Sequence, residues 1–146
     1  MDEPIWVDRV FVDAIHYDQL QQHGGHPGLG DENALESALA RPRNKLSYAL
    51  GSDLATLAAA YAFGLVTNHG YRDGNKRVAF MTAYTFLGLN GWELAASETD
   101  VVGIMLAAAE GSVSEAELAE WIRSHLAAVP TPHPAPRRSE LENHVG

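Results

Sequence analysis

The chain has 146 residues, 46% of them hydrophobic, which is typical of one small globular domain with its own core. Ten Lys and Arg residues stand against nineteen Asp and Glu residues, and the net charge of −9 argues against nucleic acid as a direct partner. Cysteine is absent, which excludes disulfides, thiolate metal sites and cysteine nucleophiles. The N-terminus is acidic and no apolar stretch is long enough to cross a membrane, so we expect a cytoplasmic protein without a membrane segment.

The N-terminal segment is predicted to form a short strand and then a helix. The apolar run at 5–7 favours the strand. Asp8 can cap the helix, which should end near the glycines at 24–25. Its inward face is predicted to carry apolar residues at helical spacing, namely Val10, Phe11, Ala14 and Ile15.

Two more helices are predicted before residue 69. After a loop rich in Gly and Pro at 26–30, Asp31 can cap a helix that should end at the breaker Pro42. Asp53 can cap the next helix, in which apolar residues recur at helical spacing as far as Val66. We expect this third helix to be the buried central one.

The next part of the chain is predicted to hold a fourth helix, a strand and a fifth helix. The fourth helix begins at about Asn75 and ends at 90–91, and a short strand is expected at 92–94. Ser97 or Thr99 can cap the fifth helix. Its inward residues are predicted to be Val101, Val102, Met105 and Leu106.

A sixth helix and a tail complete the chain. The capping box at 114–117 begins the helix, and its inward residues are predicted to be Leu118, Trp121, Ile122 and Leu126. Residues 130–146 are rich in Pro and nearly without apolar side chains, which indicates disorder. The prediction is therefore an all-α domain of about six helices at 1–129, followed by a disordered tail at 130–146.

Nine residues between the third and fourth helices, HGYRDGNKR, concentrate the polar chemistry of the chain. Gly74 permits a positive φ, so the backbone N–H groups of 74–76 can point together as an anion-binding nest at the positive end of the helix dipole. Lys76 and Arg77 add cationic side chains, which favours a phosphate chain as the ligand. His69 can take a proton from an attacking hydroxyl near neutral pH, so we expect it to be a general base.

Asp73 and Asn75 complete this set, and their roles stay open on chemistry alone. Asp73 can share Mg²⁺ with phosphate oxygens or orient His69, and the amide of Asn75 can bridge loop and ligand. The same residues also fit a plain solvated helix junction, with Asp73 as a cap and the two cations on a wet surface. A base, an acid, a nest and two cations at one helix start favour the functional interpretation.

The nine residues resemble the signature of the Fic/Doc family, His-x-Phe-x-[Asp/Asn]-[Ala/Gly]-Asn-[Gly/Lys]-Arg, in register. Lys76 resembles the death-on-curing (Doc) branch, because adenylyl-transferring Fic proteins usually carry Gly there. Tyr71 departs from the usual Phe, and Gly74 is shared with the adenylyl-transferring branch. The likeness extends over about residues 5–128 and implies a compact all-α Fic fold of about six helices, with room for a short β-hairpin or flap.

This resemblance implies a toxin of a toxin–antitoxin pair. Such a toxin is a kinase that moves the γ-phosphate of ATP, or of another nucleoside triphosphate, to a Thr or Ser hydroxyl of elongation factor Tu and so inhibits translation. The implied roles are a base for His69, a Mg²⁺ or catalytic acidic role for Asp73, and a nest at Gly74 and Asn75. Phosphates would be held by Lys76 and Arg77.

The resemblance also implies a small antitoxin whose C-terminal segment folds on the toxin. The glutamate-bearing inhibitory helix of many Fic proteins, with the pattern [Ser/Thr]-x-x-x-Glu-[Gly/Asn], is absent from the sequence, which favours inhibition by a separate partner. Two alternatives to the kinase stay open. One is a protein adenylyltransferase that transfers AMP, and the other is a catalytically silent module that binds an antitoxin or regulates.

Overall fold

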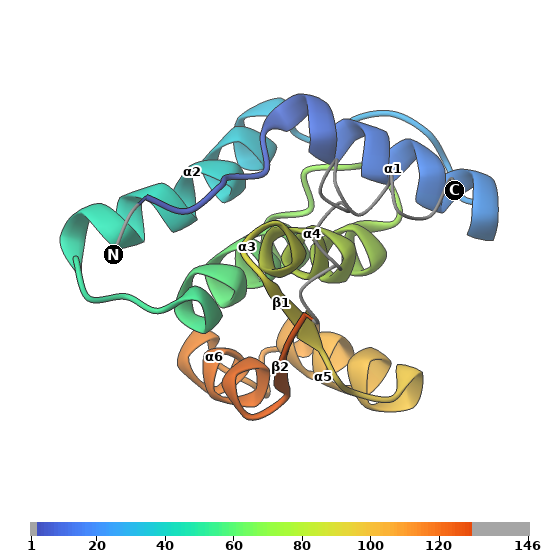
Figure 1. The fold of residues 1–146 in the computed structure, drawn as a ribbon. Helices are drawn as coiled ribbons and strands as arrows, with labels where there is room; N and C mark the ends of the chain where they lie inside the picture. The colour runs from blue at the N-terminus through green and yellow to red at the C-terminus, as the bar shows by residue number, and fades with distance from the viewer. Residues whose placement is uncertain (1–2, 130–146) are drawn as a thin grey trace, which may run out of the picture.

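The structure is a computed structural model that describes residues 3–129, and these form six α-helices and one small antiparallel sheet (Figure 1). The all-α prediction is confirmed, and the predicted tail at 130–146 lies outside the described residues. The elements in chain order are α1 Arg9–His23, α2 Glu32–Tyr48, α3 Leu54–Asn68, α4 Asn75–Leu89, β1 Trp92–Leu94, α5 Glu98–Glu110, α6 Glu115–Ser124 and β2 Leu126–Ala128.

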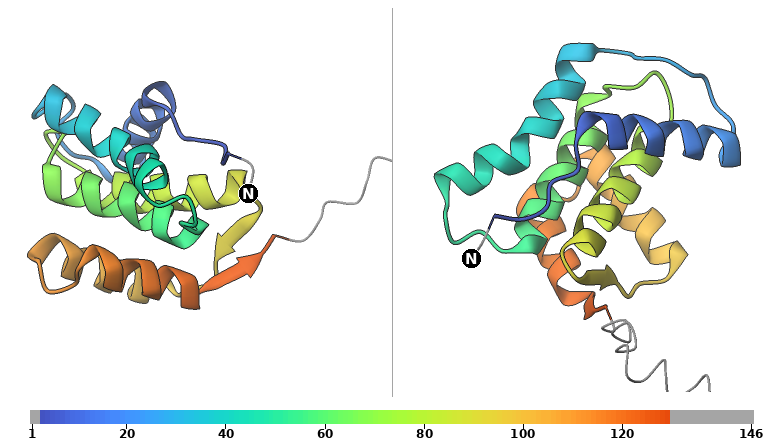
Figure 2. Two further views of the ribbon diagram at one scale, coloured as in Figure 1. Left: turned by 90° about the vertical axis from the view of Figure 1, so that its left-hand side faces the viewer. Right: turned by 45° about the horizontal axis from the view of Figure 1, so that its top comes forward.

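The helices are arranged in three layers, with α1 and α2 on one side, α3 and α4 in the middle, and α5 and α6 on the other side (Figures 1 and 2). The central position predicted for the third helix is confirmed, because α3 is buried along most of its length. Tyr61 of α3 packs against Phe86 of α4 with ring centroids 5.1 Å apart. Among residues 3–129, none of the helices is long and apolar enough to cross a membrane.

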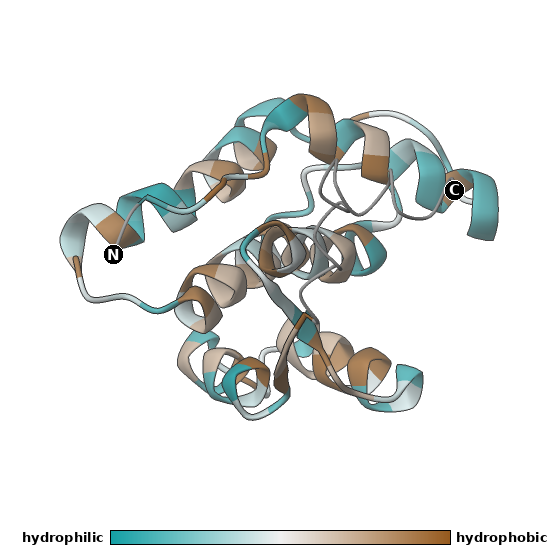
Figure 3. Cartoon of the chain, in the orientation of Figure 1, coloured by the Kyte–Doolittle hydropathy of each residue, from teal (hydrophilic) through white to brown (hydrophobic). Residues whose placement is uncertain are grey.

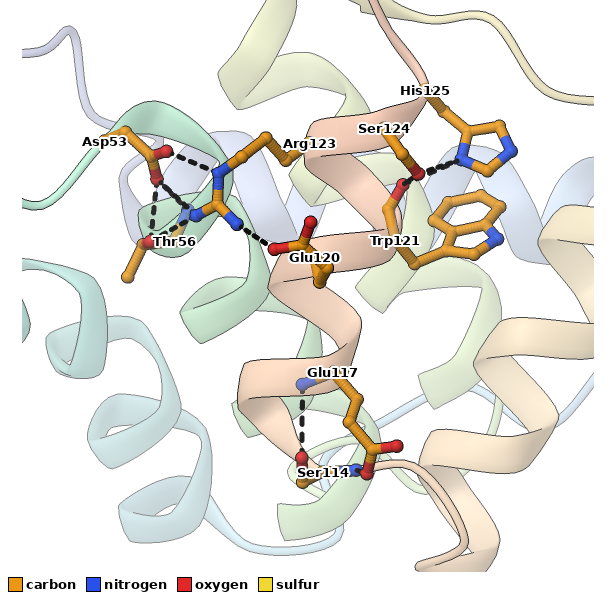
Figure 4. Close-up of polar contacts among 9 residues, drawn as sticks. All are labelled: Asp53, Thr56, Ser114, Glu117, Glu120, Trp121, Arg123, Ser124 and His125. Carbon is orange, nitrogen blue, oxygen red and sulfur yellow. Dashed lines mark hydrogen bonds and ion pairs between the residues drawn. The ribbon is translucent and has the colours of Figure 1, made fainter.

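Side-chain caps begin five of the six described helices, each at a position that the sequence predicted. The cap residues are Asp8, Asp31, Asp53, Ser97 and Ser114. Ser114 and Glu117 form the predicted capping box, in which each side chain bonds the backbone N–H of the other (Figure 4). The helix boundaries at these five N-termini are therefore set by local sequence.

Arg123 of α6 fastens the outer layer to the central helix. Its guanidinium donates to both carboxylate oxygens of Asp53, at 2.7 and 3.0 Å, and to the hydroxyl of Thr56 (Figure 4). The hydrogen bonds from Arg123 lower the pKa of the Asp53 carboxyl, so the cap of α3 is held in its charged form.

Two predictions for the N-terminal half are wrong. Residues 5–7 form no strand, because the side chain of Asn90 bonds both the N–H and the C=O of Ile5 and so replaces a neighbouring strand. The second helix does not end at Pro42 but continues to Tyr48. Pro42 is buried where α2 packs along α3, and this packing outweighs the one helical hydrogen bond that a proline removes.

The sheet also differs from the prediction of a hairpin. The strand at 92–94 is confirmed, but it pairs with β2, which lies beyond α5 and α6 in the chain, in the register Trp92↔Ala128 and Leu94↔Leu126. Leu126 was predicted to lie in the sixth helix and instead belongs to this strand. Because two helices separate these strands in the chain, no turn motif in the sequence indicates that they pair.

The inward face predicted for the first helix is mostly wrong, since only Ile15 of its four residues is buried, and that for the fifth helix is half correct. Ile15 and Met105 are buried, whereas Val10 is 78% exposed and Val102 58% exposed. The buried face of α1 consists of Val12, Ile15, His16 and Gln19. Two polar side chains, His16 and Gln19, therefore lie on the buried side of α1. The C-terminal end of this helix consists mostly of hydrophilic residues (Figure 3).

Candidate active site

A pocket of about 300 Å³ lies where α3 ends and α4 begins, with α5 contributing Ala109. All six residues that the sequence predicted for the site line it. The lining consists of His69, Asp73, Gly74, Asn75, Lys76 and Arg77 together with Val66, Arg72 and Ala109. The predicted residues thus surround one concave space instead of spreading over a flat helix junction.

The first part of the motif is fixed by pairing with the loop before α2. The carbonyl of Gly70 accepts hydrogen bonds from the N–H groups of Gly30 and Asp31, and Arg72 N–H donates to the carbonyl of Gly28. Gly70 also has to be glycine, because a Cβ there would lie 2.7 Å from the Cβ of Leu35. The start of α2 therefore determines where the motif leaves α3.

His69 caps the C-terminus of α3 in the left-handed region, with φ 51° and ψ 48°, and is the only described residue other than glycine with a positive φ. Such a conformation costs about 1–2 kcal/mol for a residue with a Cβ. The side chain is exposed at the pocket, and its ring forms no hydrogen bond with residues 3–129. The backbone of His69 is thus strained in the conformation that places its imidazole at the pocket wall, as expected for a proton acceptor.

The carboxylate of Asp73 is held by two backbone groups. Oδ1 accepts from Gly74 N–H at 2.8 Å and Oδ2 accepts from His26 N–H at 3.1 Å. These bonds, that from His26 first, lower the pKa of Asp73, so its side chain is ionised at neutral pH. Asp73 therefore presents a fixed negative charge beside the pocket.

The N-terminus of α4 has no side-chain cap within the described chain, unlike the other five helices. Gly74 stands at the cap position with φ 80°. Its N–H was predicted to join the nest but is bonded to Asp73 instead. The N–H groups of 75–77 belong to the first helical turn and have no acceptor inside the helix, so the N–H groups open to a ligand lie at 75–77 and not at 74–76 as predicted.

The two cations of the motif differ in their surroundings. Arg77 donates from Nη2 to the carbonyl of Gly24 at the end of α1, at 3.0 Å, and its buried Nε has no partner among residues 3–129. Lys76 is exposed and forms no ion pair in the same part of the chain. Arg77 is thus a positioned cation, and Lys76 is an exposed one without an ion pair among these residues.

Asn75 holds the loop through its side chain. Its Oδ1 accepts from Tyr71 N–H at 3.0 Å, and its Nδ2 donates to the Tyr71 carbonyl at 2.9 Å. Both ends of the amide are therefore engaged in the motif itself. In this arrangement Asn75 offers a ligand its backbone N–H, while its side chain shapes the turn.

Two residues of α1 support the site, and the sequence did not single them out for it. The Tyr71 hydroxyl donates to Asp13 at 2.6 Å, and the Tyr71 ring stacks on His16 with centroids 3.9 Å apart. Burial, and then the Asp13 carboxylate, raise the pKa of Tyr71, so the hydroxyl stays protonated. The hydroxyl that Tyr71 carries, where the signature has Phe, therefore has a hydrogen-bond acceptor. The i, i+3 spacing of Asp13 and His16 places them on one side of a helix and could have indicated a joint role. Using it required knowing which face of α1 is buried, and the sequence analysis predicted a different face.

Asp73 also decides how a divalent cation fits this site. Residues 3–129 contain no cluster of three or more His, Asp or Glu side chains that could hold a metal by themselves. Mg²⁺ bound with a nucleotide typically uses one or two carboxylates, and takes its other ligands from phosphates and water. One ionised, oriented carboxylate beside an anion site fits Mg²⁺ that arrives with phosphates.

Comparison with known proteins shows the family of the chain. The model of the Fic/DOC family matches residues 6–87. The chain is 29% identical to "Protein kinase doc" of Escherichia phage P1 over 110 residues, which cover 75% of this chain and 86% of that protein. It is 42% identical to "Toxin Doc" of Mycolicibacterium smegmatis over 77 residues, which cover 50% of this chain and 57% of that protein.

Proposed function

Because this chain belongs to the Fic/DOC family, we propose that it is the toxin of a toxin–antitoxin pair and transfers the γ-phosphate of a nucleoside triphosphate to a Thr or Ser hydroxyl of a protein. The names of the two Doc relatives support both parts of the proposal. The observation that carries it is the uncapped start of α4, which faces a pocket lined by Lys76, Arg77 and the imidazole of His69.

The site residues divide the reaction between them. His69 accepts the proton of the attacking hydroxyl, the hydroxyl oxygen bonds to the γ-phosphorus, and the bond from that phosphorus to the β,γ-bridging oxygen breaks. The nucleoside diphosphate leaves with the electrons of that bond. Lys76, Arg77 and the N–H groups of 75–77 stabilise the negative charge on the phosphates.

Asp73 is the residue that would hold Mg²⁺, which when bound with the nucleotide neutralises phosphate charge. The two backbone bonds of Asp73 leave each carboxylate oxygen with a further lone pair, so the side chain can accept a cation without losing its position. ATP is the first nucleotide to test.

Elongation factor Tu is the protein substrate that we propose, with inhibition of translation in the cytoplasm as the result. The regulator would be a small antitoxin whose C-terminal segment folds on this chain. The net charge of −9 suits an antitoxin segment with basic residues.

Lys76 is the basis for choosing phosphoryl over adenylyl transfer. A lysine where a glycine would leave space adds bulk and a positive charge at the first turn of α4, which favours a pose that presents the terminal phosphate. Adenylyl transfer is the second candidate, because Gly74 is shared with that branch. In it the same base would activate the hydroxyl for attack on the α-phosphate, with diphosphate as leaving group.

The test uses elongation factor Tu, Mg²⁺ and ATP labelled in parallel at the γ- and α-phosphates, with the parent protein and His69→Ala. We expect label on the acceptor from γ only, and none with the variant. Label from α only would replace the kinase by an adenylyltransferase. If the parent transfers label from γ, Lys76→Gly tests whether the Lys76 side chain directs phosphoryl over adenylyl transfer. The kinase model predicts that this variant gains α-label at the expense of γ-label. Label from neither position would contradict the proposed activity on this acceptor and favour a silent binding module.

A further inference from the structure

His16 is a buried polar residue of α1 to which the proposed reaction assigns no role. It is 6% exposed, its ring stacks on Tyr71 with an interplanar angle of 11°, and its Nε2 lies 2.9 Å from the backbone carbonyl oxygen of Asp73. A carbonyl oxygen only accepts hydrogen bonds, so Nε2 carries the proton and donates it. The stacking fixes the plane of the ring, and the hydrogen bond fixes its direction.

The bond from His16 acts on the peptide group between Asp73 and Gly74, which is otherwise held by a single hydrogen bond from its own N–H. The carbonyl of Asp73 and the N–H of Gly74 belong to the same planar peptide group and point in opposite directions. His16 holds the carbonyl on one side, and Asp73 Oδ1 accepts the N–H on the other. Glycine tolerates both signs of φ, so the residue that follows this group gives little resistance to a flip.

A flip of this peptide group would damage the site in two ways. The Asp73 carboxylate would lose the hydrogen bond from Gly74 N–H, one of its two backbone anchors. A carbonyl oxygen would also take the place of that N–H at the start of α4, where its partial negative charge would repel both the carboxylate and a phosphate.

We propose that His16 is a positioning residue that locks the Asp73–Gly74 peptide group in the orientation that keeps the start of α4 open to phosphate. Its proximity to Gly74 supports this: a Cβ on Gly74 would lie 3.7 Å from His16 Cδ2 and 3.5 Å from Arg77 Nη2, so the two side chains flank the glycine. The catalytic consequence rests on the proposed function, but the conformational consequence does not.

Two variants of His16 separate its hydrogen bond from its ring. His16→Phe keeps an aromatic ring to stack on Tyr71 and removes the donor, whereas His16→Gln supplies an N–H donor of similar reach without the ring. His125 gives a matched control, since it stacks on Trp121 with centroids 4.3 Å apart and its Nδ1 lies 2.7 Å from the Trp121 carbonyl (Figure 4). It lies at the end of α6, outside the pocket.

The first measurement is amide hydrogen exchange of the full chain, followed residue by residue by NMR without substrate. In His16→Phe we expect exchange at Gly74 and His26, the two N–H groups bonded to Asp73, to accelerate about tenfold. His16→Gln should restore slow exchange at both, and His125→Phe should leave both unchanged. Exchange at Gly74 and His26 as slow in His16→Phe as in the parent would overturn the proposal. If His16→Phe does not fold, fast exchange in the folded His16→Gln variant would also overturn it.

The second measurement is label transfer from ATP, resolved into kcat and KM. His16→Phe should lower kcat, His16→Gln should recover most of it, and His125→Phe should match the parent. Failure of the parent to transfer label would contradict the proposed function, while the exchange data would still decide the role of His16. A His16→Phe variant with fast exchange and parental kcat would overturn the catalytic part of the inference.

Discussion

The starts of α4 and α6 differ in how the backbone N–H groups of their first turns, which have no acceptor inside the helix, are bonded. At α6 the Ser114 side chain bonds Glu117 N–H and the Glu117 side chain bonds Ser114 N–H, each at 3.1 Å, so the helix start is satisfied internally (Figure 4). At α4 the cap position is Gly74, which has no side chain to offer. The N–H groups at the start of α6 are thus bonded by its own side chains, whereas those at the start of α4 have no side-chain acceptor.

The two starts also differ in backbone conformation. Ser114 has φ −77° and ψ 167°, which is ordinary extended backbone. The motif before α4 begins at His69 with φ 51° and reaches the helix through Gly74 with φ 80°. The positive φ is strained at His69, which has a Cβ, whereas Gly74 adopts it without strain. His69 is therefore held in this conformation by its neighbours, whereas the start of α6 is specified by its own residues.

His69→Gly should have the largest effect on the contrast between the motif before α4 and the start of α6. Transfer activity should fall by about 10²- to 10⁴-fold because the base is lost. The free energy of unfolding should rise by about 1 kcal/mol, because glycine adopts a positive φ without strain. Enzyme assay and urea denaturation of the same preparation measure both. A variant less stable than the parent would show that His69 is not strained.

Gly74→Ala should break the start of α4 through its backbone alone. A Cβ at Gly74 meets nothing closer than 3.5 Å, so the expected loss of about 1–2 kcal/mol in unfolding free energy comes from the positive φ. Gly103→Ala is the matched control, because Gly103 lies inside α5 with open space around its Cβ position. That variant should gain about 0.5–1 kcal/mol. Denaturant unfolding curves that shift in the same direction would refute the distinction.

Ser114→Ala should break the start of α6 without touching the site. Loss of the capping box should cost about 1 kcal/mol in unfolding free energy. Label transfer per folded molecule should equal that of the parent, since α6 contributes no side chain to the pocket. Reduced transfer at full folding would show that the two helix starts are coupled.

Asp53→Asn should have the smallest effect and should appear in acid. The pKa of Asp53 is lowered in the folded state by Arg123, so its contribution to stability is complete above the ordinary value of 3.8 and is lost as the pH falls below it. Because the pair is largely exposed, the contribution is less than about 1 kcal/mol. Thermal melts from pH 6 to pH 2 should therefore fall less steeply for the variant than for the parent.

Local patterns were sufficient for most of the elements. Asp31, Asp53 and Ser114 are caps that act on residues three positions away, so their helix starts could be predicted from neighbouring sequence. The end of α2 could not, because the chain continues through Pro42 only where α3 is packed against it. The pairing of β1 with β2 likewise depends on how α5 and α6 return the chain.

The same division holds for the site. The sequence by itself determined the fold class, the family resemblance and the six residues at 69–77 that line the pocket, because they are close together in the chain and their chemistry is local. Only the tertiary structure decided which N–H groups remain for an anion, that the Asn75 amide holds the loop, and that His16 and Asp13 support it. The contacts of His16 and Asp13 join α1 to a loop more than fifty residues away, and their geometry arises only when the packed layers bring the two segments together. The bonds within the loop are local, but which backbone groups they engage depends on the loop conformation that this packing holds.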